Sequence, residues 1–184
     1  MTKIDIFSGF LGAGKTTLIK KLIAEAYTGE KLVLIENEFG EISVDGGFLK
    51  DAGVEITEMS SGCICCSLVG DFAEALKKVK TQFAPDRILI EPSGVGKLSD
   101  VVPGSFTTVV DATRAKMYMK NFGEFWCNQV ENAGAIVLSR TKGMSEGKLA
   151  ACVDMLREHN KDAVIVTTPW DELDGKTLRA AMEH

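Results

Sequence analysis

Short apolar runs alternate with longer segments of helical periodicity along this chain. Residues 72–83 show the helical pattern most clearly, because their large apolar side chains recur at i, i+4, i+7 and i+11 and so share one face of a helix. The apolar runs lack polar alternation and are rich in β-branched residues, as is typical of strands buried on both faces of a sheet. The predicted strands are 3–7, 32–35, 54–59, 87–90, 107–110, 135–138 and 163–166, and the predicted helices include 18–26, 72–83 and 149–157.

This alternation of strands and helices predicts an α/β fold, with a mainly parallel central sheet between two layers of helices. In such a sheet, ligands bind outside the carboxyl ends of the strands. The unusual residues of the chain follow those ends: SGFLGAGKTT the first predicted strand, ENEFGE the second, EPSG the fourth and SRTKG the sixth. We therefore expect a binding site along this edge of the sheet.

Length and charge narrow the class of protein. The chain has 184 residues, of which 45% are hydrophobic, and it shows no recognisable linker or repeat. We therefore expect a single domain over residues 1–184. The formal charge of -5 argues against nucleic acid and membrane as partners, since both are recognised through clustered basic residues. The chain shows no signal-peptide pattern and no apolar run of the ~18 residues that a membrane span needs. These features predict a soluble, cytoplasmic protein with reduced thiols.

The segment after the first predicted strand has the pattern of a phosphate-binding loop. Gly9, Gly14, Lys15 and Thr16 satisfy GxxxxGK[ST] between a strand and an amphipathic helix. Glycines let backbone N–H groups wrap a phosphate chain, and the helix N-terminus adds partial positive charge. We expect Lys15 to contact the β and γ phosphates and Thr16 to bind Mg2+.

A nucleoside triphosphatase also needs a carboxylate near the magnesium ion and a loop that senses the γ phosphate. Glu91 follows a buried strand and begins EPSG. We predict that Glu91 holds or orients a magnesium-bound water, and that the Gly94 N–H faces the γ phosphate. The competing interpretation is a solvated Glu in a glycine-rich loop.

Three cysteines lie within four positions, at Cys63, Cys65 and Cys66. Close thiol spacing in a reducing compartment favours metal binding, and soft thiolates suit Zn(II), Cu(I) and related ions. The cluster needs at least one further ligand, because its local spacing cannot complete a tetrahedral site. A redox pair of Cys63 and Cys66 and a set of buried structural thiols remain open as alternatives.

The segments SGFLGAGKTT, IENEFGE, GCICC and EPSG, in this order, closely resemble the nucleotide-binding domain of the CobW-like metallochaperone GTPases, which are related to the nickel-insertion GTPases of urease and hydrogenase. The resemblance covers nearly the whole chain and implies the three-layer sandwich of the P-loop NTPases. Its most specific element is the CxCC cluster between a P-loop and a Walker B segment.

The resemblance also implies roles for particular residues. It assigns residues 9–17, with Gly12, Ala13 and Thr17 among them, to nucleotide binding, and residues 36–41 and 91–94 to the two switch regions. It implies that the three cysteines bind a transition metal such as zinc or cobalt, with Glu36 and Glu41 as carboxylate partners. GTP and Mg2+ would be the cofactors, and a client metalloprotein and a second copy of the chain would be partners.

The chain departs from this family in two places. The guanine-recognition segment Asn-Lys-x-Asp is replaced by residues 139–142, where Arg140 can lie over the base but Lys142 offers no acceptor for guanine N1 and N2. ATP, relaxed base specificity, or an acceptor among Asp171, Glu172 and Asp174 are therefore open. The family's additional C-terminal domain, often with a His-rich stretch, is expected to be absent.

Together these features predict a P-loop NTPase, with GTP the expected nucleotide, that couples Mg-NTP hydrolysis to the delivery of a transition metal. A small-molecule kinase and a non-hydrolysing metal or redox sensor are the alternatives. Of the remaining residues, we expect Cys127 and Cys152 to be small core residues and Trp126 and Trp170 to pack. Asp111 is expected to cap the following helix rather than to join the site.

Overall fold

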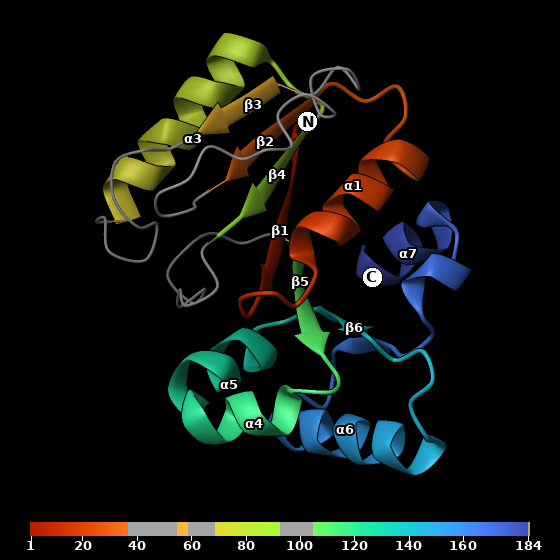
Figure 1. Cartoon of the computed structure of the whole chain (residues 1–184). Helices are drawn as coiled ribbons and strands as arrows, with labels where there is room; N and C mark the ends of the chain where they lie inside the picture. Colours follow the sequence, from red (N-terminus) through yellow and green to blue (C-terminus); the bar gives the residue numbers. More distant parts are fainter. Residues whose placement is uncertain (37–54, 59–68, 93–104, 184) are drawn as a thin grey trace.

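Seven parallel strands form the central sheet of the computed structural model, which describes residues 1–36, 55–58, 69–92 and 105–183. Their order is β3-β2-β4-β1-β5-β6-β7, and each recorded pairing between neighbours is parallel (Figure 1). The sheet therefore places all its carboxyl ends at one edge. The strands are β1 (Lys3–Gly9), β2 (Leu32–Glu36), β3 (Glu55–Glu58), β4 (Arg87–Glu91), β5 (Ser105–Asp111), β6 (Ala135–Ser139) and β7 (Val164–Val166).

Helices cover both faces of this sheet. Along β1, Phe7 packs with α1 (Lys15–Glu25) and α7 (Gly175–Met182), whereas Ile6 faces α3 (Val69–Phe83) on the opposite side. The second face also carries α4 (Ala115–Asn121), α5 (Gly123–Glu131) and α6 (Glu146–His159), whose apolar side chains pack on β5 and β6. Strands buried on both sides explain the lack of polar alternation in the sequence, and the predicted three-layer α/β sandwich is confirmed.

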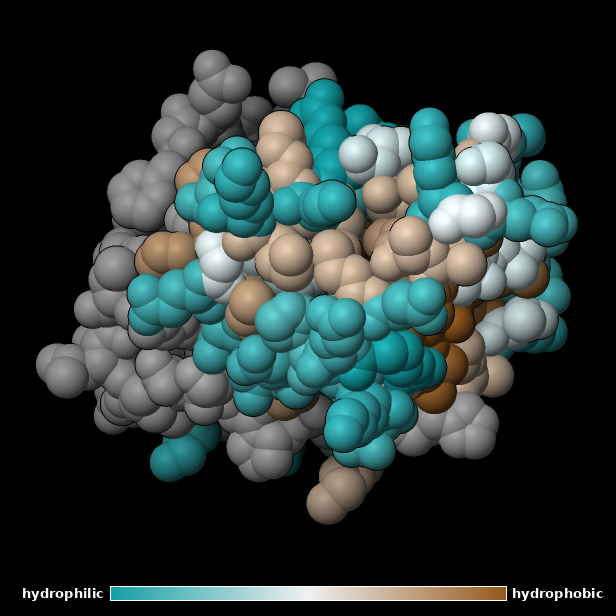
Figure 2. Space-filling view, turned by 90° about the horizontal axis from the view of Figure 1, so that it is seen from below, coloured by the Kyte–Doolittle hydropathy of each residue, from teal (hydrophilic) through white to brown (hydrophobic). Residues whose placement is uncertain are grey.

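The outer surface formed by α4, α5 and α6 is seen from below in Figure 2. Polar side chains cover much of this face, with apolar side chains between them. Among the described residues, no helix combines the length and the apolar character that crossing a membrane requires.

At the amino edge of the sheet, Arg87 is fully buried at the start of β4. Its guanidinium pairs with Asp5, with Glu30 at 2.7 Å and with Glu183 at 2.8 Å. It also lies over the Tyr27 ring, 4.4 Å from the centroid. Three carboxylates and an aromatic face thus satisfy a buried charge that would otherwise be very costly.

The seven predicted strands are confirmed, with small differences at their ends. The chain also forms the short 3-10 helix η1 (Trp170–Glu172) and α7, which were not predicted. The sequence does carry a signal for α7, because the Asp174 side chain caps it by accepting from the Thr177 N–H at 2.9 Å, and Leu178 and Met182 follow at helical spacing.

Candidate functional site

The loop between β1 and α1 has the backbone geometry of a phosphate cradle. Gly9, Gly12 and Gly14 all have positive φ, at 140°, 70° and 103°. A Cβ on Gly9 would lie 2.3 Å from the Val109 carbonyl oxygen, so β1 ends beside β5 at a distance that no side chain would permit. The pattern of glycines in the sequence is therefore required by the path of the chain.

Lys15, at the first position of α1, is buried under this loop. Its ammonium donates to the Gly9 carbonyl at 3.0 Å and the Phe10 carbonyl at 3.4 Å, and it lies 3.9 Å from Glu91 Oε1. The charge is thus held at the helix N-terminus, where backbone N–H groups also favour an anion.

Thr16 and Glu91 meet beside Lys15. The Thr16 hydroxyl donates to both oxygens of the Glu91 carboxylate, at 3.1 and 3.2 Å, and Glu91 is buried at the end of β4. A hydroxyl and a carboxylate are oxygen ligands of the kind that Mg2+ prefers, so the donor set fits the predicted magnesium site. The structure thus brings the predicted Glu91 to the predicted neighbours Lys15 and Thr16, about 75 residues away in sequence.

Three glutamates end neighbouring strands at the same edge. Glu36 is opposite Glu91 in the pairing of β2 with β4 and opposite Glu58 in the pairing of β2 with β3. Of the predicted site residues, Glu36 is described through its backbone alone, and five lie outside the described residues: Glu41, Cys63, Cys65, Cys66 and Gly94.

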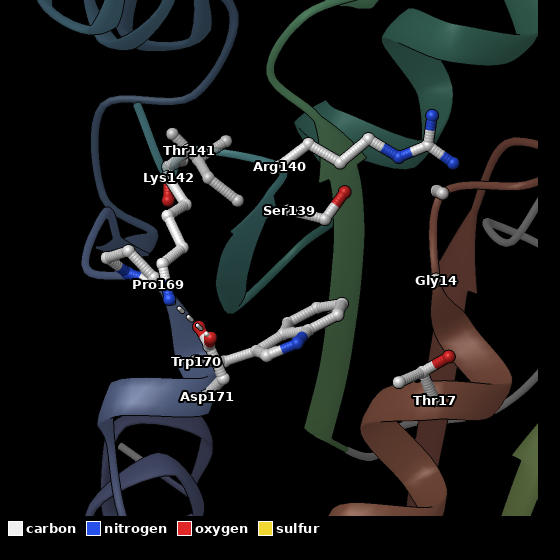
Figure 3. Close-up of a pocket in the computed structure, with 11 residues that line it drawn as sticks. Gly14, Thr17, Ser139, Arg140, Thr141, Lys142, Pro169, Trp170 and Asp171 are labelled. Atoms are coloured by element: carbon white, nitrogen blue, oxygen red, sulfur yellow. Dashed lines mark hydrogen bonds and ion pairs between the residues drawn. The ribbon is translucent and has the colours of Figure 1, made fainter. Parts of the chain in front are cut away.

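A cavity of about 380 Å³ lies next to the P-loop, between α1, the end of β6 and the segment around η1 (Figure 3). Ala13, Gly14 and Thr17 line it on one side and residues 138–142 on another. Among the described residues, Thr141 Oγ1 is the single buried side-chain polar atom without a hydrogen-bond partner, and Thr141 lines this cavity. Because the cavity lies beside the P-loop, the cavity is the candidate site for the nucleotide base.

Arg140 connects this cavity to the P-loop. Its backbone has a left-handed conformation, with φ 58°, and its guanidinium donates to the Gly12 carbonyl at 2.9 Å. The same guanidinium lies 3.1 Å from Asp111 Oδ2. The expectation that Asp111 caps a helix is wrong: α4 starts after Arg114, which is its N-cap residue, and the Asp111 carboxylate instead holds Arg140 and the Thr113 N–H.

The sequence predicts only packing for Trp170 and offers Asp171 as one of three possible acceptors for the base, whereas the structure places both residues at this cavity. The Trp170 ring lies against Gly14, since a Cβ there would be 2.9 Å from the ring, and it points into the cavity (Figure 3). Trp170 therefore packs, as expected, but as a wall of this cavity. Lys142 Nζ lies 3.3 Å from Asp171 Oδ2 at the cavity rim. No sequence motif marks Trp170 and Asp171 as residues of a binding cavity, so a single sequence does not reveal their position there.

Two cysteines are described by the structure, Cys127 and Cys152. Cys152 is buried between α6 and the sheet, and burial, assisted by the negative charge of Asp111, raises the pKa of its thiol. Cys152 is thus a core residue, as predicted. Cys127 is only half-buried and packs at the edge of the same cluster.

Comparison with known proteins agrees with this geometry. The family model "CobW/HypB/UreG, nucleotide-binding domain" matches residues 3–167. Two zinc chaperones of Escherichia coli K12 are similar in sequence: YjiA is 31% identical over 93% of this chain, and YeiR is 43% identical over 52% of it. The matches cover 58% of YjiA and 29% of YeiR, so the chain spans only part of the length of these relatives.

Solved structures show the same fold. The hydrogenase maturation factor HypB of Archaeoglobus fulgidus superposes with a TM-score of 0.73 at 19% identity, over 98% of this chain and 90% of that one. The Zn(II)-bound YjiA GTPase of E. coli superposes with a TM-score of 0.64 at 25% identity, over 91% of this chain and 57% of that one. On the extent of the family match and the P-loop geometry, this chain belongs to the CobW/HypB/UreG nucleotide-binding domain family.

Proposed function

We propose that this chain is a nucleotide-dependent metallochaperone that binds Mg-GTP at the P-loop and uses its hydrolysis to control the binding and delivery of Zn(II). The observation that carries the proposal is the contact of Thr16 with Glu91, because it joins the P-loop to the end of β4 at the place where a metal-bound triphosphate would lie. The relatives, which are zinc chaperones and a Zn(II)-bound GTPase, support zinc as the cargo.

Each residue near the P-loop has a role in this proposal. Lys15 neutralises charge on the β and γ phosphates, and the loop N–H groups bind their oxygens. Thr16 and Glu91 would hold Mg2+, which when bound supplies charge neutralisation at the phosphates. Glu91 would orient the attacking water, with Gly94 contributing an N–H beside the γ phosphate.

The cargo site would combine Cys63, Cys65 and Cys66 with a carboxylate from Glu36 or Glu41. Support comes from the strand register, because Glu36 and Glu91 end adjacent strands and the segment with the cysteines follows Glu58 in the chain. A change at the γ phosphate that moves Glu91 would therefore act next to the strand that ends at Glu36. Coupling of this kind resembles other nucleotide switches.

A zinc competition experiment tests the proposal. The reduced protein is titrated with Zn(II) against a chromophoric chelator, with and without Mg2+ and a non-hydrolysable GTP analogue. We expect the analogue to change Zn(II) affinity by roughly 5- to 150-fold, the usual range of coupling between two sites. The Lys15→Ala variant should bind Zn(II) but lose the response to nucleotide, and Lys20→Ala, on the same helix, serves as the matched control.

Equal zinc affinity under all conditions would overturn the proposal and favour a metal sensor that uses the fold as a scaffold. Transfer of the γ phosphate to a small molecule instead of water would favour the kinase alternative. Measuring phosphate release in the same samples separates these outcomes.

A further inference from the structure

The ends of α5 and α6 bring three metal-ligating side chains together, away from the P-loop. Cys127 and Glu131 lie one helical turn apart on α5, and His159 is the last residue of α6. One ligand atom from each residue lies within 4.8 Å of the other two. His159 Nδ1 is 3.4 Å from Glu131 Oε1.

We propose that Cys127, Glu131 and His159 form a second transition-metal site, suited to Zn(II), with a fourth position open to water or to a ligand from another protein. Thiolate, imidazole and carboxylate are the three ligand types that Zn(II) takes in proteins, and sites with three protein ligands keep an exchangeable position. In a tetrahedral Zn(II) site, neighbouring nitrogen and oxygen ligands are separated by about 3.3 Å, given metal–ligand distances near 2.0–2.1 Å. The His159–Glu131 separation of 3.4 Å is close to this value, and the Cys127 thiol lies within 4.8 Å of both ligand atoms.

The backbone around the cluster is firmly held. The buried Asn160 side chain donates to the Val130 and Ala133 carbonyls at 2.8 Å each, and accepts from the Ala163 N–H at 2.8 Å. Asn160 directly follows His159 and thereby ties the end of α6 to the end of α5. Ligands whose backbones are fixed in this way lose little freedom when a metal binds.

The neighbouring side chains and the electrostatic potential at the ends of α5 and α6 also favour a cation at this cluster. The His159 ring meets the buried Trp126 ring edge-on, with centroids 5.9 Å apart, which restricts how the imidazole can turn. Glu131 and His159 are the terminal residues of their helices, and helix C-termini carry partial negative charge. About half of the Glu131 side chain is exposed, which leaves the cluster accessible from solvent.

The proposed site lies at the edge of the sheet opposite to the nucleotide site. Both helices end next to the amino ends of β6 and β7, where the Val164 N–H donates to the Gly134 carbonyl at 3.0 Å, whereas the P-loop follows the carboxyl end of β1. The inference goes beyond the proposed function and does not depend on it, because neither the P-loop nor the Cys63–Cys66 cluster takes part. We therefore expect metal binding here to be independent of nucleotide.

The test uses the full chain with Cys63, Cys65 and Cys66 all changed to Ser, so that the first cluster cannot bind. Zn(II) competition titrations should show one remaining equivalent per chain, and Co(II) should give a thiolate-to-metal charge-transfer band. Adding Cys127→Ser should abolish that band, and adding Glu131→Gln or His159→Gln should weaken Zn(II) binding by more than about tenfold. Cys152→Ala is the matched control and should leave the band intact.

Two results would overturn the site: no stoichiometric Zn(II) binding by the triple-Ser chain, or a charge-transfer band that survives Cys127→Ser. In that case the cluster is an ordinary polar contact between His159 and Glu131. Circular dichroism of each variant excludes misfolding as the cause. If nucleotide does not change the Zn(II) affinity of the unmodified chain, only the proposed function is overturned. Zn(II) binding at Cys127, Glu131 and His159 is expected to be independent of nucleotide in any case.

Discussion

Lys142 and Asp171 form an ion pair, 3.3 Å apart, at the rim of the candidate base cavity. The family resemblance predicts a guanine-recognising aspartate at the position of Lys142, and Asp171 places a carboxylate at the same cavity. Both side chains are largely exposed, at 71% and 58%, so the pair contributes little to stability. Substituting either residue of the pair should therefore leave the protein folded, so that a change in nucleotide affinity reports on binding alone.

We predict that Asp171→Asn weakens binding of a GTP analogue by roughly 10- to 100-fold, because guanine N1 and N2 lose a charged acceptor. ATP-analogue binding should change less, and fluorescence titration with labelled nucleotides measures both. Glu172→Gln is the control, because this exposed carboxylate follows Asp171 in the chain but does not line the cavity. If Asp171→Asn leaves the GTP affinity unchanged, Asp171 is not the guanine acceptor.

The reciprocal change, Lys142→Asp, places a carboxylate at the family's position. It should increase the preference for GTP over ATP. Competition between the two unlabelled nucleotides reports that ratio directly. A preference that moves toward ATP would show that Lys142 itself contacts the base.

Glu91→Gln should bind nucleotide and still lose most of its hydrolysis, because the amide cannot orient water or balance Mg2+ as a carboxylate does. Thr16→Ala should instead raise the Mg2+ concentration needed for half-maximal activity. Phosphate release measured over a range of Mg2+ concentrations distinguishes the two changes. Normal turnover by Glu91→Gln would remove Glu91 from the mechanism.

Two glycines of the P-loop offer a paired stability test. Gly9→Ala should cost more than about 2 kcal/mol, since its Cβ would collide with the Val109 backbone oxygen as well as strain the local conformation. Gly12→Ala meets no atom within 4 Å, so only its left-handed conformation is penalised, by about 1 kcal/mol. Urea unfolding of both variants provides the comparison, and equal losses would contradict the described path of the loop.

The carboxylates around Arg87 predict how stability depends on pH. Burial raises the pKa of Glu183 and of Glu30, but hydrogen bonds and positive charge from Arg87 and Arg179 outweigh it and hold both values below the ordinary 4.5. Because the folded-state pKa values are lowered, the stabilisation is present above pH 4.5 and is lost as the pH falls below it.

Urea unfolding between pH 7 and about pH 3 tests this dependence. We expect Glu183→Gln to lower stability at pH 7 and to flatten the decline in acid. Glu158→Gln, an exposed carboxylate on α6, should do neither. An unchanged slope for Glu183→Gln would mean that this network does not contribute to acid sensitivity.

Features encoded by neighbouring residues could be predicted from the sequence, whereas contacts between distant segments could not. The P-loop was predictable because its glycines, lysine and threonine are contiguous, and the strands were predictable because burial on both faces leaves long apolar runs. The ion pair of Lys142 with Asp171 joins two loops, and only the fold brings them together. Periodicity carries no information about such a contact.

Asp111 shows a different limit. A short acidic side chain after a strand is typical of a helix cap, and this general preference suggested the wrong role. The observed role depends on Arg140, which approaches from the adjacent strand end. A partner of opposite charge at the end of the neighbouring strand therefore gives Asp111 a role that the local preference does not predict.

The order of synthesis has a consequence for the packing of α1 against α7. Leu18 and Leu22 of α1 share a core with Leu178 and Met182 of α7. The Gly175 N–H, at the start of α7, donates to the Glu25 carboxylate at 2.8 Å, although the two residues are 150 positions apart in the chain. On the ribosome, α1, which follows the P-loop, therefore emerges well before α7, the helix that completes its packing. A nascent chain should acquire nucleotide binding late and abruptly, when residues up to Met182 have left the exit tunnel.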